Sequence, residues 1–207
     1  MPTNPEKHWE SIYRTKAPNE VSWYQPEPRL SLQLIRRVAP DLEAPIIDVG
    51  GGPSLLVDGL LDAGYRNVTV LDLAPTALAL AQQRLGERAR HVRWIAADTL
   101  DASLPAAEYA VWHDRAVFHF LLDPKDRSRY VAQTRRSVRS GGHAIVASFS
   151  PEGPPKCSGL EVVRYSPTAM HAEFGEGFRL LDSMRENHLT PSGVTQAFVY
   201  CLCLVES

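Results

Sequence analysis

Acidic residues and a run of glycines stand at regular places in the first half of the chain. Asp48 lies just before the glycines at 50–52. Asp72 comes 24 residues after Asp48, and Asp98 follows later. A glycine turn lets a ligand approach the backbone closely, and a helix that follows it offers unpaired N–H groups to an anion such as a carboxylate. An acidic residue at the next strand end can accept both hydroxyls of a ribose, and a polar side chain one strand later can reach an adenine amino group.

The elements that must position these residues are short apolar strands. Apolar and partly β-branched residues at 45–49, 67–73 and 92–96 predict three strands, and the three aspartates lie at their carboxyl ends. Alone, a glycine turn is usually only a turn, and a strand-end aspartate usually caps a helix. Three such ends in succession are more specific, because doubly wound sheets bind ligands at the carboxyl ends of their strands.

Strands and helices alternate through the middle of the chain, which indicates a parallel α/β sheet. Two more strands are expected at 109–112 and 143–149, and helices at 30–38, 55–61, 75–84 and 126–139. The glycines at 141–142 are expected to cap the last of these helices. Residues 178–187 and 196–205 predict two strands with only a turn between them. The predicted fold is therefore α/β, a doubly wound Rossmann-like seven-stranded sheet with an antiparallel C-terminal hairpin.

Charge and cysteine content exclude several classes of function. The net charge is −2, so no basic field points to nucleic acid or to an anionic membrane. No apolar stretch reaches the ~18 residues of a membrane span, and the N-terminus lacks the apolar segment of a secretory signal. The three cysteines suit free thiols in a reducing cytosol. We therefore expect a cytoplasmic protein without nucleic acid or membrane partners. Composition does not distinguish a monomer from a homodimer, and we expect one of these two.

The first 28 residues are unusually aromatic, with Trp9, Tyr13, Trp23 and Tyr24. A disordered tail would be poor in aromatic residues, so we expect this segment to pack on the core edge or on a ligand. It could form a lid that keeps water from a bound cation, since aromatic faces attract cations. It could equally form an apolar strap over the edge of the sheet.

The glycine motif and the order of the elements resemble the class I S-adenosylmethionine-dependent methyltransferases. Asp48, Gly50 and Gly52 match the glycine motif of that family, and Ser54 stands where a third glycine is common. Leu55 breaks the G-x-G-x-x-G pattern of NAD-binding enzymes. Those enzymes would also extend the sheet in parallel, whereas the predicted hairpin fits the methyltransferases.

The resemblance implies S-adenosyl-L-methionine as the cofactor. Its methionine part would lie over Gly50–Gly52, its ribose on Asp72 and its adenine beside Asp98 and Thr99. The implied cofactor-binding residues are Trp23, Asp48, Gly50, Gly51, Gly52, Ser54, Asp72, Leu73, Asp98, Thr99 and His113.

The resemblance also suggests one methyltransferase domain over residues 1–207. Residues 1–28 would form the N-terminal aromatic lid segment and residues 40–150 the cofactor-binding core. Residues 151–207 would form the substrate-side loop and the C-terminal hairpin.

Two branches of the family share local features with this chain. Residues 113–116 (HDRA) and 124–130 resemble the thiopurine, thiol/halide and tellurite methyltransferases. So does the N-terminal segment with its tryptophans, which in those enzymes closes over the cofactor. Residues 8–10 and 21–24 resemble the openings of small protein-lysine methyltransferases. The overall organisation does not separate the two branches.

The chemistry of the acceptor bears on this choice. Methyl transfer from a sulfonium is an in-line displacement, to which the enzyme contributes orientation and desolvation. A soft nucleophile such as a thiolate, selenide or arsenite needs little or no general base, whereas a lysine or a hydroxyl must first lose a proton. The soft small-molecule acceptors in question are a thiol or a selenium, tellurium or arsenic species. We expect a small soft nucleophile. The alternatives are a protein lysine and, in another class, a non-catalytic cofactor-binding module.

Candidate catalytic residues follow the fourth predicted strand. His113 could take a proton and Asp114 could order the site, so both are predicted to be catalytic. Tyr24, Arg115 and Cys157 are predicted to contact the substrate. Alternatively, Asp114 and Arg115 form a structural pair and His113 only lines the cavity.

The remaining histidines and cysteines suit structural roles. No Cys-x-x-Cys or His-x-x-x-His spacing supports a zinc site, so no metal is expected. Cys201 and Cys203 alternate along the last strand and are expected to be small core residues. His188, beside the hairpin turn, is expected at the surface.

Overall fold

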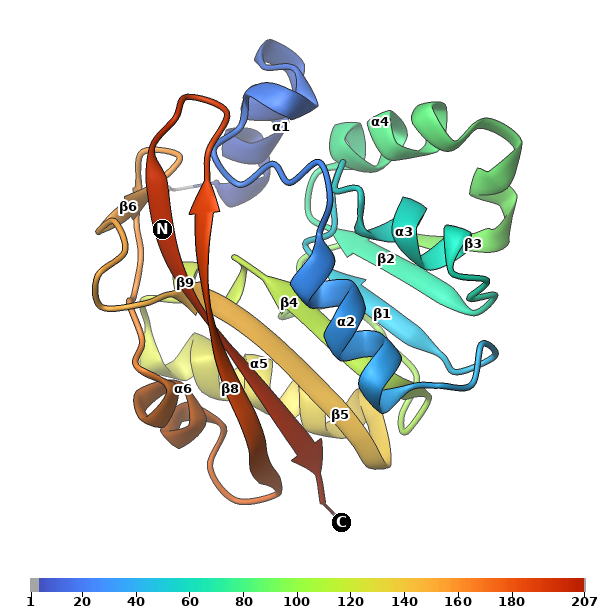
Figure 1. Cartoon of the computed structure of the whole chain (residues 1–207), viewed down its shortest axis with the longest axis vertical. Helices are drawn as coiled ribbons and strands as arrows, with labels where there is room; N and C mark the ends of the chain where they lie inside the picture. The colour runs from blue at the N-terminus through green and yellow to red at the C-terminus, as the bar shows by residue number, and fades with distance from the viewer. Residues whose placement is uncertain (1–3, 207) are drawn as a thin grey trace.

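The computed structural model describes residues 4–206 and contains a seven-stranded sheet with helices on both faces (Figure 1). Its strands are β1 (Ile46–Val49), β2 (Val68–Asp72), β3 (Val92–Ala96), β4 (Tyr109–Arg115), β5 (Val138–Phe149), β8 (Phe178–Leu189) and β9 (Thr195–Val205). A second sheet pairs β6 (Lys156–Cys157) with β7 (Leu160–Glu161). The residues at 1–3 and 207, which the predicted lid segment and domain include, lie outside the described residues.

Helices alternate with these strands through the core. The α-helices are α1 (Pro5–Thr15), α2 (Arg29–Val38), α3 (Leu56–Asp62), α4 (Pro75–Leu85), α5 (Pro124–Ser137) and α6 (Pro167–Phe174). Three short 3-10 helices are η1 (Pro18–Glu20), η2 (Gly86–His91) and η3 (Phe118–Phe120).

The strand order is β3-β2-β1-β4-β5-β9-β8. The strands β1 to β5 run parallel, and β9 is antiparallel to both of its neighbours, β5 and β8. The predicted doubly wound sheet with a C-terminal hairpin is therefore confirmed. The order reverses between β1 and β4, so the carboxyl ends of these two strands border the crevice where such sheets bind ligands.

Each face of the sheet has its own apolar core. Helices α2, α3 and α4 cover one face, where Leu34 and Leu60 are buried. Helices α5 and α6 cover the other face, where Tyr130 is fully buried. Cys201 and Cys203 of β9 lie in this second core, which confirms that they are small core residues. Because both faces are covered, the central strands are apolar on both sides.

The end of α5 differs from the sequence prediction. The helix ends at Ser137, and the glycines at 141–142 lie within β5 rather than at a helix cap. The pairing of β4 with β5 shifts register there, from Tyr109↔Val138 to Val111↔His143. Gly141 has a φ of +76°, which suits the extra residues of such an irregularity. The glycines therefore serve a strand irregularity, and the C-cap prediction was wrong.

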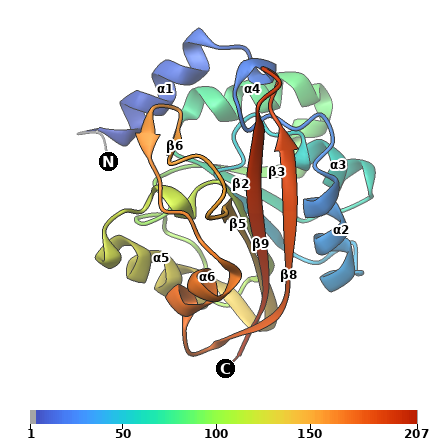
Figure 2. The same ribbon diagram turned by 60° about the vertical axis from the view of Figure 1, so that its left-hand side comes forward.

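The N-terminal helix α1 packs against α4 beside the carboxyl ends of the strands (Figures 1 and 2). Asn4 caps it by accepting a hydrogen bond from the backbone N–H of Lys7 at 2.9 Å. Glu10 accepts hydrogen bonds from the backbone N–H and the hydroxyl of Thr76, at 2.8 and 2.7 Å. These two bonds fix α1 to the first turn of α4.

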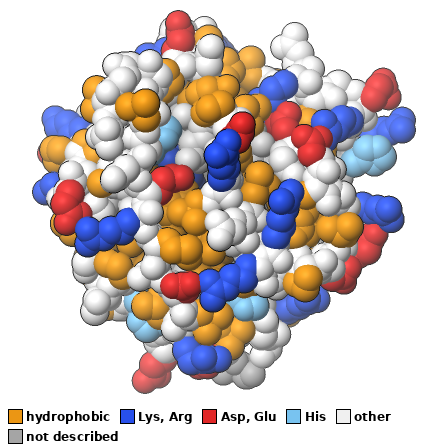
Figure 3. All heavy atoms as spheres, in the orientation of Figure 1, with side chains coloured by type: hydrophobic (Ala, Val, Ile, Leu, Met, Phe, Trp, Pro, Cys, Tyr) orange, Lys and Arg blue, Asp and Glu red, His pale blue; other side chains and the backbone are white. Residues whose placement is uncertain are grey.

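The surface carries charges of both signs. Figure 3 shows basic and acidic side chains interspersed over one face. Ion pairs join exposed side chains of the protein, such as Arg66 and Glu43 at 3.1 Å. Among the described residues, no helix is both long enough and apolar enough to span a membrane.

Candidate active site

A cavity lies between α1 and the carboxyl ends of the central strands. The space free of protein atoms there, open solvent included, amounts to about 930 Å³. One part, which we call the carboxylate half, is lined by Gly50, Asp72, Leu73, Asp98, Thr99 and Leu100. The other part, the aromatic half, is lined by Trp9, Tyr13, Trp23, Arg115, Phe120, Tyr130 and Cys157, together with small and aliphatic side chains.

The glycine turn at 50–52 brings the backbone to the carboxylate half. The N–H groups of Gly50 and Gly51 both donate to the carbonyl of Leu71, at 2.7 and 3.2 Å. Gly50 has a φ of +66°, and a Cβ there would collide with the side chain of Val117. A Cβ on Gly52 would lie 3.0 Å from a carboxylate oxygen of Asp72. Only glycine therefore allows the turn to lie this close to its neighbours.

Asp72, at the carboxyl end of β2, is the central acid of this half. It is buried, and its Oδ1 accepts the N–H of Ala74 at 2.8 Å. Burial raises the pKa of Asp72 to about 7, and the nearby charge of Asp48 adds to the rise, while the N–H groups of Ala74 and Gly52 oppose it. The carboxylate is thus poised to ionise near neutral pH and to accept a hydroxyl.

Asp98, Thr99 and Leu73 line the same half, as the sequence predicts for cofactor contacts. One carboxylate oxygen of Asp98 accepts the N–H of Leu100 at 2.9 Å, which fixes the side chain at the end of β3. The strand ends of β2 and β3 therefore bring three predicted cofactor-binding residues together beside the glycine turn.

Five predicted cofactor-binding residues lie outside the cavity lining, namely Asp48, Gly51, Gly52, Ser54 and His113. The hydroxyl of Ser54 accepts the N–H of Leu56 at 3.1 Å, in the turn that leads into α3. The carboxylate of Asp48 accepts a hydrogen bond at 2.7 Å from Nδ1 of His113. The other ring nitrogen of His113, Nε2, lies 2.9 Å from the hydroxyl of Ser31 in α2.

We expect His113 to face the transferred methyl, but the structure places it behind the glycine turn. Its side chain is buried, and both ring nitrogens are paired. The reason is its depth in the strand: His113 pairs with Asp48 inside the sheet, whereas Arg115, two residues further on the same face, reaches the cavity at the strand end.

Asp114 also lies outside the cavity lining, on the opposite face of β4. Its carboxylate accepts the N–H groups of Val117 and Phe118, at 2.9 and 3.0 Å, and the hydroxyl of Tyr130. Burial raises the pKa of Asp114 to about 6, although these donors oppose the rise. The contacts brace the turn from β4 into η3, which agrees with a structural role for this acid.

Aromatic rings form the wall of the aromatic half. The rings of Trp9 and Trp23 meet edge to face with centroids 5.6 Å apart, and Tyr13 lies 6.3 Å from each. Phe120 of η3 meets Trp9 at 5.1 Å. The N-terminal aromatic residues therefore both line the cavity and pack on the domain. Tyr24, predicted to contact the substrate, lies outside this lining.

Arg115 ties the N-terminal segment to the C-terminal hairpin. Its guanidinium donates to the carbonyl of Trp23 at 3.1 Å, to Tyr200 at 2.9 Å and to Glu186 at 3.2 Å. It also lies over the ring of Phe198, 4.1 Å from the centroid. Its main ionic partner is thus Glu186, and the predicted pairing with Asp114 is not formed.

Cys157 in β6 lines the cavity and is 3% exposed. Burial raises the pKa of its thiol to about 12, so the sulfur is protonated at neutral pH. His188, expected at the surface, is instead buried, with Nε2 2.7 Å from the carbonyl of Ser22. Burial lowers the pKa of His188, and the bond holds the N-terminal segment against β8.

Residues 46–142 match the family model of the methyltransferase domain. This match covers the glycine turn, the acidic strand ends and the strands that position them. Together with the sheet order, this match supports a class I methyltransferase domain that uses S-adenosylmethionine.

Two groups of relatives are similar to this chain at low identity. The eEF1A lysine and N-terminal methyltransferase of Mus musculus is 22% identical over 149 residues, which are 69% of this chain and 21% of that protein. The human EEF1A lysine methyltransferase 2 is 23% identical over 86% of this chain and 75% of its own length. The chain thus spans about a fifth of the mouse relative.

Solved structures share the fold over almost the whole chain. The N-methyltransferase NodS of Bradyrhizobium japonicum, in complex with S-adenosyl-L-homocysteine, aligns with a TM-score of 0.75. The alignment covers 98% of both chains at 17% identity. At this identity the likeness concerns the fold, including the antiparallel hairpin.

Proposed function

We propose that this protein transfers a methyl group to a small acceptor whose reacting atom is a soft nucleophile, such as a thiol or a selenium, tellurium or arsenic species. The observation that carries this proposal is the set of titratable residues lining the aromatic half, namely Tyr13, Arg115, Tyr130 and Cys157. Burial raises the pKa of both tyrosines well above its usual range and that of the thiol to about 12. Among the described residues of this lining, none is therefore a base at neutral pH.

The carboxylate half fits the methyl donor. The buried carboxylate of Asp72 can accept ribose hydroxyls, and Asp98 with Thr99 borders the place of an adenine. The backbone at Gly50–Gly52 can hold the methionine part, because side chains are absent there. S-adenosylmethionine supplies, when bound, a methyl group on a cationic sulfur.

The aromatic half would orient the acceptor and keep water out. Trp9, Tyr13 and Trp23 present ring faces and edges, which favour a cationic sulfur and exclude solvent. Arg115 borders the acceptor and holds the carbonyl of Trp23, so it fixes one wall of the cavity. A thiolate, selenide or arsenite that enters already ionised has left its proton in solvent, so no side chain need take it, and orientation and desolvation suffice.

A protein lysine is the second candidate acceptor. The names of the eEF1A lysine methyltransferases favour it, since these are relatives by sequence. A lysine must lose its proton before attack. Among the described residues that line the aromatic half, none is a carboxylate that could attract an ammonium or take its proton, and the charge of Arg115 is already paired with Glu186. This observation favours the small acceptor.

The experiment is to offer the protein a labelled methyl donor with a panel of thiols, selenite, tellurite, arsenite and iodide, and separately with a cell lysate. We expect label in small or volatile products. Label confined to a protein band would establish the lysine alternative instead. Binding of S-adenosylhomocysteine without any labelled product would indicate a non-catalytic binding module.

A further inference from the structure

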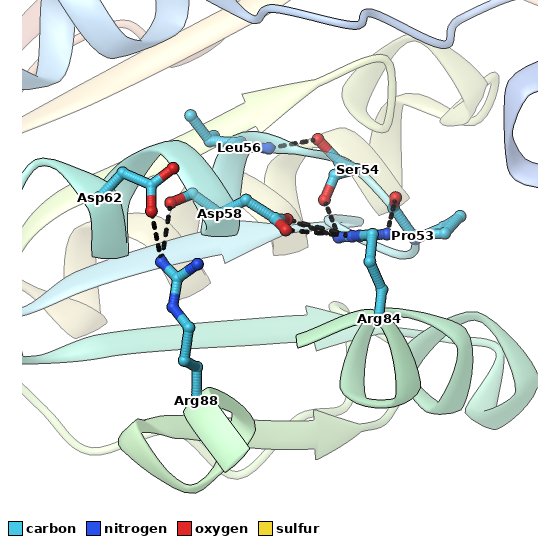
Figure 4. Close-up of polar contacts among 7 residues, drawn as sticks. All are labelled: Pro53, Ser54, Leu56, Asp58, Asp62, Arg84 and Arg88. Carbon is cyan, nitrogen blue, oxygen red and sulfur yellow. Dashed lines mark hydrogen bonds and ion pairs between the residues drawn. The ribbon is translucent and has the colours of Figure 1, made fainter. Parts of the chain in front are cut away.

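The side chain of Arg84 in α4 points to Pro53 and Ser54, the two residues that follow the glycine turn (Figure 4). Its Nη1 donates to the carbonyl of Pro53 at 2.7 Å, and its Nη2 donates to the carbonyl of Ser54 at 2.8 Å. These two carbonyls directly follow Gly52. One guanidinium therefore holds the C-terminal end of the glycine turn, which lies at the proposed donor site.

Asp58 in the first turn of α3 holds this guanidinium in place. Nε of Arg84 lies 3.2 Å from both carboxylate oxygens, and Nη2 lies 2.7 Å from Oδ2. The Arg84 side chain is 27% exposed and the Asp58 side chain 23% exposed. Only the planar fork of an arginine can engage two carbonyls and a carboxylate together.

Both ends of the turn are fastened to the unit formed by β2 and α4. At the N-terminal end of the turn, the carbonyl of Leu71 accepts the N–H groups of Gly50 and Gly51. At the C-terminal end, Arg84 donates to the two carbonyls that follow Gly52. The same unit carries Asp72, whose carboxylate accepts the N–H of Ala74 at the start of α4. The distance between the turn and Asp72 is thus set by contacts within one structural unit.

We propose that Arg84 is a positioning residue for the methyl donor, acting through the carbonyls of Pro53 and Ser54. Arg84 fastens the turn to the β2–α4 unit and so keeps the backbone at 50–52 at a fixed distance from Asp72. The two parts of the site can then bind the methionine part and the ribose of one donor molecule simultaneously. This inference rests on the proposed donor site and adds a residue outside the cavity lining.

Arg88 provides a matched control one turn further along. Its Nη2 donates to Asp62 at 2.6 Å and lies 3.5 Å from the carbonyl of Asp58. Like Arg84 it joins the end of the α4 region to α3, but both of its hydrogen bonds go to α3 itself, to Asp58 and Asp62 (Figure 4). Loss of Arg88 removes a neighbouring, more exposed ion pair to the same helix and leaves the carbonyls of Pro53 and Ser54 bound.

The test compares Arg84→Ala, Arg84→Lys and Arg88→Ala by titration calorimetry with S-adenosylhomocysteine and by steady-state kinetics. We expect Arg84→Ala to weaken binding about tenfold, as for one charge-assisted hydrogen bond, and to raise KM for the donor similarly with kcat changed less than about twofold. Arg84→Lys should restore part of the affinity, because an ammonium can engage one carbonyl. Arg88→Ala should bind as the wild type does.

Hydrogen exchange of the unliganded protein gives a second readout that does not need the cofactor. We expect faster exchange within residues 50–54 in Arg84→Ala than in Arg88→Ala. If Arg84→Ala does not fold, Asp58→Asn replaces it in the comparison. We expect this variant to lose less affinity for S-adenosylhomocysteine than Arg84→Ala and to show a smaller increase in exchange. Unchanged affinity and exchange in the Arg84 or Asp58 variant, or an equal loss in Arg88→Ala, would overturn the inference. If the wild-type protein does not bind S-adenosylhomocysteine, the proposed donor site is refuted. The hydrogen-exchange comparison would still test whether Arg84 holds residues 50–54 in place.

Discussion

Backbone groups and strand-end acids make the carboxylate half of the cavity, whereas side chains from separate segments make the aromatic half. In the carboxylate half, the glycine turn and Asp72 come from consecutive strands and are fixed by bonds within that unit. In the aromatic half, Arg115 joins Trp23 and Glu186, which lie 92 and 71 residues away along the chain. The two halves thus depend on local and long-range structure respectively.

This difference assigns separate tasks to the two halves. A backbone cradle with fixed acids suits a ligand of constant structure, such as the methyl donor. A wall of side chains held by the N-terminal segment and the hairpin can differ in shape without any change to the cradle. Changes in the carboxylate half should therefore affect donor binding, and changes in the aromatic half should affect the acceptor and the exclusion of water.

The largest effect is expected for Asp72→Ala. Loss of a charged acceptor for two hydroxyls should weaken S-adenosylhomocysteine binding about a hundredfold. Calorimetry measures it, with Asp101→Ala as control, because Asp101 pairs with Arg129 at 2.6 Å outside the cavity lining. Unchanged affinity in Asp72→Ala would remove the ribose assignment.

The pH dependence of donor binding should be next in size. The pKa of Asp72 is raised to about 7, so the free protein holds this proton more tightly than the unfolded chain does. Stability of the free protein should fall as the pH rises from about 4 to about 7. Donor affinity should instead rise, by about tenfold from pH 6 to pH 8, because ribose hydroxyls bind the ionised form. In Asp72→Asn this rise should disappear, and its persistence would point to another group.

Trp23→Ala tests the aromatic half and should have a smaller effect on the donor. We expect the KM of the acceptor to rise about fivefold to tenfold, since one ring of the wall is lost. Trp94→Ala is the control, because this indole bonds to the carbonyl of Ala89 outside the cavity lining. A lowered melting temperature with normal kinetics would favour a strap over a lid.

The smallest effect is expected for Cys157→Ser. The thiol is protonated at neutral pH, since burial raises its pKa to about 12, and it is therefore not a nucleophile. Methylation of arsenite and of thiols should stay within about twofold of the wild type. Cys201→Ser, in the core, controls for burial of a hydroxyl. Loss of arsenite methylation alone would assign the sulfur to the mechanism.

The sequence predicts the carboxylate half better than the aromatic half. The glycines and Asp72 follow adjacent parallel strands, so local patterns suffice to place them together. The position of His113 depends on how deep it lies in β4, which the expected strand of 109–112 does not define. The partners of Arg115 depend on the β8–β9 register, and no local pattern reveals Glu186 or Tyr200.

The N-terminal segment shows the same limit. Its aromatic residues are visible in the sequence, and the structure places Trp9 and Trp23 in the cavity wall. The segment is held in place by hydrogen bonds between Glu10 and Thr76, which are 66 positions apart in the chain. No local sequence pattern predicts this contact. Composition alone therefore indicates that the segment packs, while its place follows only from the folded chain.

The central claim is that the carboxylate half binds the methyl donor, and its most direct test is a calorimetric titration of the wild-type protein with S-adenosylhomocysteine at pH 8. We expect saturable binding of one molecule per chain. No heat of binding at millimolar ligand, confirmed by the absence of a thermal shift, would contradict the account, and the turn at 50–52 would then be only a connection between a strand and a helix.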